Sequence, residues 1–203
     1  MKAVIAIIAS YLLGSISFGY LTGKLLKGID IRQYGSGNAG TTNIQRTLGT
    51  IPALVVLLLD VGKGIVAVTI AKYLSDVSFI HLLAGVAVVI GHNWPLFFGF
   101  RGGRGIATTI GVFCGLVPAV VLVAVVVGLI IIAVTRYVSL GSIIGALSIP
   151  ITMLILKMPA THIIFGVVMA LMAVWRHRQN IDRLLRGTEN KLGMKVDLGD
   201  EGK

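Results

Sequence analysis

The sequence predicts an all-helical integral membrane protein with seven transmembrane helices. Hydrophobic residues make up 56% of the 203 residues and charged residues only 13%, so the chain has more apolar surface than a soluble core of this size buries. Apolar stretches of about 20 residues, the length that crosses a hydrocarbon layer roughly 30 Å thick, recur along it. We therefore expect residues 1–203 to form a single membrane domain surrounded by lipid.

This pattern places seven apolar segments. They cover residues 3–22, 51–73, 79–98, 105–117, 118–135, 139–156 and 160–175. The first follows Lys2 in the manner of a signal peptide, but the later spans favour an uncleaved first helix. The stretch 105–135 is long for one tilted helix and short for two full spans. Pro118 predicts a turn between two short helices there.

The basic residues predict how the spans are oriented. With seven spans, Lys2, Lys72 and Lys157 face one side, Lys63 lies inside a span, and the other lysines and arginines gather on the opposite side. Basic loops stay in the cytoplasm, so the N-terminus is expected outside and the C-terminus inside. The cytoplasmic parts are then the loops at about 23–50 and 98–105 and the tail at about 176–203.

Composition also limits the classes of partner. The net charge of +10 is explained by basic loops at a membrane, so we expect no nucleic-acid partner. The single cysteine, Cys114, allows no internal disulfide. No cluster of ligating residues has metal-site spacing, and we expect neither a metal nor a cofactor. Gly141 and Gly145, at GxxxG spacing, favour close helix packing within a monomer, with dimerisation as the alternative.

The first basic loop contains GSGNAGTTN at residues 35–43. Its glycines permit positive φ and its small polar side chains offer many donors, a composition suited to binding an oxyanion. The candidates are Ser36, Asn38, Thr41 and Asn43, with Arg46 close behind to contact a phosphate. The alternative is an ordinary flexible polar turn between helices.

The second basic loop contains GFRGGRG at residues 99–105. Gly102, Gly103 and Gly105 bracket Arg104, and we expect main-chain amides and the Arg104 guanidinium to converge on an anion at the start of the next helix, where the helix dipole favours negative charge. Thr108 adds a hydroxyl one turn into that helix. The Walker pattern GxxxxGK[ST] is absent, so the loop does not indicate ATP hydrolysis.

A third basic segment, WRHRQNIDRLLRGTENK at residues 175–191, follows the last span. Its arginines, together with His177 and Asn180, are suited to phosphate at the membrane surface. The alternative is a basic cap that contacts anionic lipid head groups.

Three polar residues inside the spans are further candidates for a structural or functional role. Asp60 and Lys63, three residues apart in the second span, are expected to pair with each other or, alternatively, to contact a substrate. Ser142, near the cytoplasmic start of the sixth span, has the depth to join the same site as the basic loops.

Together these motifs resemble the acyl-phosphate:glycerol-3-phosphate acyltransferases of bacterial plasma membranes. The likeness covers nearly the whole chain, through YLLGSISFGYL, GSGNAGTTN, LDVGKG, GHNWPLFFGFRGGRGIAT, RYVSL and RHRQNIDRLLRGTE in this order. It implies a seven-helix enzyme that transfers a fatty acyl group from acyl phosphate to the sn-1 hydroxyl of glycerol 3-phosphate, giving lysophosphatidate and phosphate. That reaction is the first acylation step of bacterial phospholipid biosynthesis.

The resemblance also implies roles for individual residues. The catalytic positions it implies are Ser36, Asn38, Arg46, Arg104, His177 and Asn180. The substrate-binding positions are Thr41, Asn43, Gly102, Gly103, Thr108, Ser142 and Glu189. The family usually has GGKG where this chain has GGRG, so Arg104 replaces a lysine and keeps its positive charge.

His177 and Asp182 also have the HxxxxD spacing of a different class of acyltransferases. On a continuous helix the two would lie about 140° apart, and we interpret the match as a coincidence. An acyl phosphate is already activated, so direct attack by the glycerol hydroxyl is expected, without an acyl-enzyme on Cys114. The proton acceptor is left open between His177 and the departing phosphate.

Two other classes of protein remain as alternatives. Charges inside the membrane also occur in small channels and transporters. A membrane-embedded assembly subunit is less favoured, because it would not need three phosphate-suited segments on one face.

Overall fold

A computed structural model describes residues 1–194 as a bundle of helices. In chain order these are α1 (Lys2–Gly14), α2 (Phe18–Lys27), a 3₁₀ turn (Ile31–Gln33), α3 (Thr41–Leu48), α4 (Thr50–Leu74), α5 (Ser78–Asn93), a second 3₁₀ turn (Leu96–Phe98), α6 (Ile106–Leu116), α7 (Pro118–Thr135), α8 (Val138–Ile155), α9 (Ala160–Arg176) and α10 (Arg178–Leu185). No strand occurs within this part of the chain, as predicted. Two basic residues of the predicted tail, Lys195 and Lys203, lie outside the described residues.

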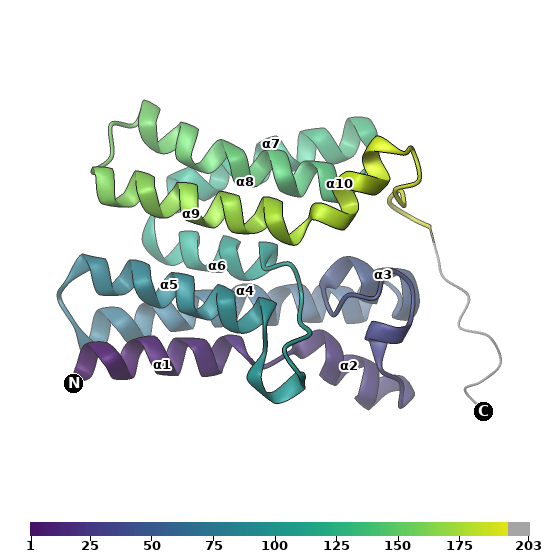
Figure 1. Cartoon of the computed structure of the whole chain (residues 1–203), viewed down its shortest axis with the longest axis horizontal. Helices are drawn as coiled ribbons and strands as arrows, with labels where there is room; N and C mark the ends of the chain where they lie inside the picture. The colour runs from purple at the N-terminus through teal and green to yellow at the C-terminus, as the bar shows by residue number, and fades with distance from the viewer. Residues whose placement is uncertain (195–203) are drawn as a thin grey trace.

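The helices lie along one axis and form two packed groups (Figure 1). α1, α4, α5 and α6 pack together, and α7, α8 and α9 form the second group, joined to the first where α6 contacts α7 and α5 contacts α9. In the shared core the rings of Phe113 and Phe165 lie 5.2 Å apart. Large apolar side chains such as Leu58 and Val134 stay exposed on the outside, as a lipid-facing surface requires.

Several helices have the length and apolarity to cross a membrane. Within residues 1–194 there are five such segments: 2–27, Thr50–Leu74, Ser78–Phe98, Pro118–Thr135 and Val138–Ile155. α9 and α10, joined across a bend of 59°, make a sixth if counted together. The predicted span at 105–117 is α6, an apolar helix of 11 residues. α7 begins at Pro118, so the stretch 105–135 divides into two helices where the proline predicts it.

The first predicted span and the first predicted loop differ from the structure. Span 3–22 is broken between α1 and α2, and the predicted loop 23–50 contains the end of α2 and all of α3. The break lies where α5 crosses α1 so closely that a side chain on Gly14 would collide with the backbone of Val88. α3 forms because Ile44 packs into an apolar cluster with α4. The motif GSGNAGTTN, which overlaps the start of α3, had indicated a polar turn as the alternative to an anion-binding loop.

Lys63 stabilises the break between α1 and α2. Its ammonium lies 2.8 Å from Asp60 Oδ1 and donates to the carbonyl oxygens of Gly14, at 3.1 Å, and Ile16, at 3.0 Å. Breaking a helix frees carbonyl groups that find no water inside a membrane, and Lys63 satisfies two of them. The predicted internal pair of Asp60 and Lys63 is confirmed.

We expect Lys63→Met to melt at a lower temperature than the parent protein in detergent. The substitution leaves the Asp60 carboxylate buried without its cation, a loss of about 3–5 kcal/mol. Lys72→Met makes the same change at an exposed lysine and serves as the control. Thermal unfolding followed by circular dichroism checks this, and equal melting temperatures for the two variants would contradict it.

Candidate active site

Asn43 holds the first basic loop in shape. Its Oδ1 accepts hydrogen bonds from the Ser36 N–H, at 2.8 Å, and the Ser36 hydroxyl, at 3.2 Å, and its Nδ2 donates to the carbonyl oxygens of Ile31 and Tyr34. The Asn43 side chain is almost fully buried, and these bonds occupy its amide. Ser36, Asn38 and Thr41 lie on the partly exposed surface of the loop that Asn43 folds.

The second basic loop departs from expectation in its backbone. The Gly102 N–H donates to the Asn93 carbonyl oxygen at 3.3 Å and the Gly103 N–H to the His92 carbonyl oxygen at 3.1 Å. A side chain on either glycine would collide with His92. The prediction that these two amides point at an anion is therefore wrong. The glycines instead let the loop pack closely against the end of α5, which leaves Arg104 as the charged group at the start of α6.

Glu189 organises the third basic segment. Its Oε1 accepts hydrogen bonds from the Asn180 amide, at 2.7 Å, and the Ser139 hydroxyl, at 2.8 Å, and its Oε2 accepts one from Arg183 Nε at 2.7 Å. Burial alone would raise the pKa of Glu189, but these hydrogen bonds outweigh it and lower the pKa. The carboxylate thus joins α8, α10 and the segment that follows α10.

His177 lies at the bend between α9 and α10. Its Nδ1 contacts the Ala173 carbonyl oxygen at 2.8 Å, and because a carbonyl only accepts, Nδ1 carries the proton and Nε2 is left as an acceptor. Burial and the charge of Arg104 lower the pKa of His177 to about 4. Asp182 pairs instead with Arg186, at 2.9 Å. This contact confirms that the HxxxxD spacing is a coincidence.

The three basic segments meet at one end of the bundle. Arg176 Nη2, at the end of α9, donates to the Gly103 carbonyl oxygen at 2.6 Å. Arg46 Nη2, on α3, donates to the Asn190 carbonyl oxygen at 3.3 Å. Figure 1 shows α3, the loop that enters α6, and α10 at the same end, opposite the N-terminus.

Positive charge exceeds negative charge where these segments meet. Burial and the nearby charges of Arg183, Arg46 and Arg176 lower the pKa of Arg104 to about 10, with Glu189 partly opposing them. Burial also lowers the pKa of Arg46. Arg104 still stays protonated at neutral pH, so four guanidinium groups face a single carboxylate. Such an arrangement attracts an anionic ligand.

An apolar groove begins beside this end of the bundle. It runs between α6, α7 and α8, has a volume of about 120 Å³ and is lined mostly by small and branched apolar side chains, including Ile106, Val121 and Ile149. Ser142 and Thr109 are its polar lining residues. The predicted Thr108 lies nearby on α6, fully buried, and within the described residues its hydroxyl has no hydrogen-bond partner.

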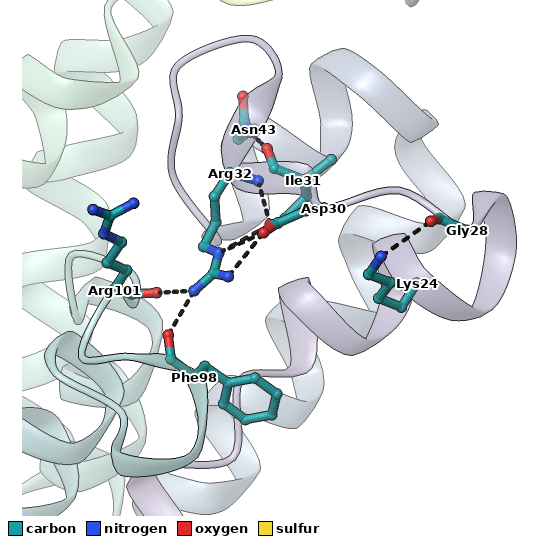
Figure 2. A network of polar contacts seen from close by, with 8 residues as sticks. All are labelled: Lys24, Gly28, Asp30, Ile31, Arg32, Asn43, Phe98 and Arg101. Atoms are coloured by element: carbon teal, nitrogen blue, oxygen red, sulfur yellow. Dashed lines mark hydrogen bonds and ion pairs between the residues drawn. The ribbon is translucent and has the colours of Figure 1, made fainter. Parts of the chain in front are cut away.

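Sequence reasoning missed two residues of this region. Ser139, at the start of α8, donates a hydrogen bond to Glu189. It belongs to the motif RYVSL, but nothing in that motif set it apart from a serine that only caps a helix. Arg32 links the first basic loop to the second (Figure 2), and the sequence showed only another basic residue in a basic loop.

The family of this chain follows from its sequence similarity. The profile of the family described as glycerol-3-phosphate acyltransferase matches residues 4–187. The chain belongs to the glycerol-3-phosphate acyltransferase family. It is 48% identical to the glycerol-3-phosphate acyltransferase of Halalkalibacterium halodurans, covering 94% of this chain and 96% of that protein. It is 50% identical to the glycerol-3-phosphate acyltransferase of Desulforamulus reducens, over 96% of this chain and 98% of that protein.

Solved structures agree with this assignment. Two crystal structures of PlsY (YgiH), described as an integral membrane glycerol 3-phosphate acyltransferase, are similar to this acyltransferase. The glycerol 3-phosphate form has a TM-score of 0.90 at 41% identity and covers 95% of this chain and 96% of PlsY. The lysophosphatidic acid form has a TM-score of 0.88 at 40% identity and covers 96% of this chain and 97% of PlsY. The predicted family, acyltransferase activity and membrane location are confirmed.

The pH dependence of this acyltransferase tests the state of His177. Because its pKa is about 4, His177 is neutral from about pH 5 upward, and protonation removes its Nε2 acceptor only below that. Any inflection in the pH profile of kcat/KM between about pH 5 and 8 then comes from ionisation of the substrates. The parent and His177→Asn should therefore show the same inflections. An inflection near pH 6.5 in the parent alone would contradict this. If the variant is inactive, an NMR titration of the His177 ring in the parent measures its pKa directly, and a value near 6.5 would contradict the prediction.

Proposed function

We propose that this chain transfers a fatty acyl group from acyl phosphate to the sn-1 hydroxyl of glycerol 3-phosphate, releasing lysophosphatidate (1-acylglycerol 3-phosphate) and phosphate. The observation that carries the proposal is the group of arginines around Arg104, with Glu189 as the carboxylate that opposes them, placed beside an apolar groove. Both proposed substrates bear phosphate, and the donor also bears an apolar chain. The glycerol 3-phosphate and lysophosphatidic acid forms of PlsY support the same substrate and product.

The proposed reaction is one direct displacement. The sn-1 oxygen attacks the carbonyl carbon of the acyl phosphate, the carbon–oxygen bond to phosphate breaks, and phosphate departs with the bonding electron pair. The hydroxyl proton passes to the departing phosphate or to His177 Nε2. Arg46 and Arg104 neutralise the phosphates, and Ser36, Asn38 and Asn180 orient the hydroxyl and the carbonyl.

The remaining predicted residues support the reactants. Asn43 shapes the loop that carries Ser36, and Thr41 and Thr108 contribute hydroxyl groups. Gly102 and Gly103 bring Arg104 close to α5, Ser142 borders the acyl groove, and Glu189 holds Asn180 in place.

We also propose that the chain crosses a bacterial cytoplasmic membrane seven times, with α6 as a short pass. The N-terminus then lies outside, and the loops at about 23–50 and 98–105 and the C-terminal tail lie in the cytoplasm with the site. The basic residues of these segments favour this orientation. Labelling in intact cells tests it, in a Cys114→Ser background with Gln33→Cys or Asp76→Cys. An impermeant maleimide that reached Gln33→Cys and not Asp76→Cys would overturn it.

A monomer is the proposed functional unit. Gly141 and Gly145 of α8 pack against Gly128 of α7 so closely that a side chain on Gly141 would collide with the Gly128 carbonyl. The GxxxG pair therefore packs within the chain, which supports the monomer rather than the dimerisation that the motif left as an alternative. Light scattering of the purified protein in detergent tests this, and a dimer mass would overturn it.

The decisive experiment supplies purified protein in lipid nanodiscs with synthetic acyl phosphate and radiolabelled glycerol 3-phosphate. We expect labelled lysophosphatidate and equimolar phosphate. Parallel reactions with acyl-CoA and with acyl carrier protein thioesters identify the donor. Product from a thioester and none from acyl phosphate would overturn the proposed donor, and no product from any donor would overturn the proposed reaction.

A further inference from the structure

Arg32 sits between the first two basic segments, and Asp30 fixes its orientation. Asp30 Oδ1 accepts hydrogen bonds from the Arg32 N–H, at 3.0 Å, and from Arg32 Nε, at 2.9 Å, while Oδ2 lies 2.8 Å from Nη2. A carboxylate that holds a guanidinium through two nitrogens fixes the plane of that group. The pair is partly buried, with the two side chains 20% and 19% exposed. Arg32 therefore points in one defined direction.

The third nitrogen of Arg32 reaches the second basic loop. Its Nη1 donates to the carbonyl oxygens of Phe98, at 2.6 Å, and Arg101, at 3.3 Å. Figure 2 shows both bonds crossing from the segment before α3 to the turn between α5 and α6. The guanidinium also lies 4.7 Å from the centre of the Tyr20 ring, which in turn packs against Phe98. One side chain thus joins α2, the first loop and the second loop.

The turn that Arg32 holds is strained. Between Phe98 and Arg101, Gly99 has a φ of 67° and Phe100 a φ of 58°. A side chain as large as phenylalanine rarely adopts positive φ, and such a conformation persists only where surrounding contacts impose it. Arg32 bonds the carbonyl on each side of Phe100, so it closes the turn like a clamp.

Both ends of this clamp lead directly into the candidate site. Ser36 lies four residues after Arg32, in the loop that Asn43 ties to Ile31. Arg104 lies three residues after Arg101. Each guanidinium nitrogen of Arg32 already has a protein partner, so Arg32 is not placed to bind a phosphate itself.

We propose that Arg32 is a positioning residue for acyl transfer, which sets the distance between the loop carrying Ser36 and Asn38 and the loop carrying Arg104. This inference rests on the proposed function, because it assigns the two loops to the same reaction. A small displacement of reacting groups lowers turnover strongly, whereas loss of the two Arg32 bonds to the second loop leaves the transmembrane helices packed.

Activity measurements compare Arg32→Ala with Arg101→Ala. The second variant loses the same charge from the same junction, but the Arg101 side chain points away from Arg32, which bonds only its carbonyl (Figure 2). We expect kcat to fall about ten- to a hundredfold in Arg32→Ala and to stay within about twofold in Arg101→Ala. Arg32→Lys keeps the charge but not the fork, so its activity should resemble that of Arg32→Ala. Full activity in Arg32→Lys would overturn the clamp.

A distance measurement tests positioning without chemistry. Spin labels at Gln33→Cys and Phe97→Cys, in a Cys114→Ser background, report the separation of the two loops by double electron–electron resonance. We expect a broader distribution in Arg32→Ala and an unchanged one in Arg101→Ala. An unchanged distribution in Arg32→Ala, or a broader one with full activity, would overturn the proposal. An inactive parent would count against the proposed function instead.

Discussion

Arg104→Ala is expected to lower kcat/KM for glycerol 3-phosphate acylation about ten- to a hundredfold, mainly through a higher KM for a phosphate-bearing substrate. Arg104 lies among Arg46, Arg176 and Arg183 with one carboxylate opposing them, so its charge acts on whatever anion enters. A hydrogen bond to a charged group contributes about 1.5–3 kcal/mol, which is the source of this magnitude. Steady-state rates with each substrate varied in turn identify the phosphate involved.

The matched variant for this prediction is Arg104→Lys. It restores the residue that the resemblance leads us to expect at this position and keeps the charge, so we expect it to recover most of the activity lost in Arg104→Ala. The alanine variant should insert into membranes and melt at or above the melting temperature of the parent, because the substitution removes repulsion between arginines. Unchanged Michaelis constants and turnover in Arg104→Ala would show that the arginine cluster does not bind substrate.

Glu189→Gln is expected to abolish most of the activity and to lower the melting temperature. The side chain is 8% exposed and accepts hydrogen bonds from Ser139, Asn180 and Arg183. Glutamine keeps one acceptor but turns a donor toward Arg183, which leaves a charged group without its partner at a cost of about 3 kcal/mol. The last helix and the tail then lose their anchor on α8.

The pH dependence of stability provides a second check on Glu189. Its pKa is lowered in the folded protein, so the stability it contributes is present above its unfolded pKa, about 4.3, and is lost as the pH falls through the folded value. The difference in melting temperature between parent and Glu189→Gln should therefore shrink in acid. Asp182→Asn, at an exposed carboxylate that pairs with Arg186 just after α10, is the control and should melt like the parent. A Glu189→Gln variant as stable as Asp182→Asn would contradict the anchor.

The sequence was informative where a single pattern determines the outcome. Pro118 marked the start of α7 because proline cannot continue the preceding helix, and the apolar runs located the long helices because only an uninterrupted apolar surface is stable in lipid. The same patterns misled at residues 15–17 and 41–48. The apolar run of the first span does not reveal a break whose carbonyl groups are bonded by a distant lysine. The polar segment that follows the glycines of the first loop does not reveal a helix that packs on α4.

In the candidate site too, the sequence identified some residues and missed others. Arg46, Arg104, His177 and Asn180 were found from composition and from the family resemblance, but their neighbours were not. Ser139 and Arg32 carry no local signal, because their importance comes from Glu189, Phe98 and Arg101, which lie far away along the chain. The amides of Gly102 and Gly103 were misjudged because the sequence does not show which carbonyl groups approach a loop.

By itself the sequence determined the membrane environment, the family and the charged residues near the helix ends, since hydropathy, motif order and charge are local properties. Only the tertiary structure decided which of those residues meet, which backbone groups are already bonded, and that Arg32 and Glu189 hold the segments together. The physical reason is that hydrogen bonds and buried charges depend on distances between groups that chain order does not fix.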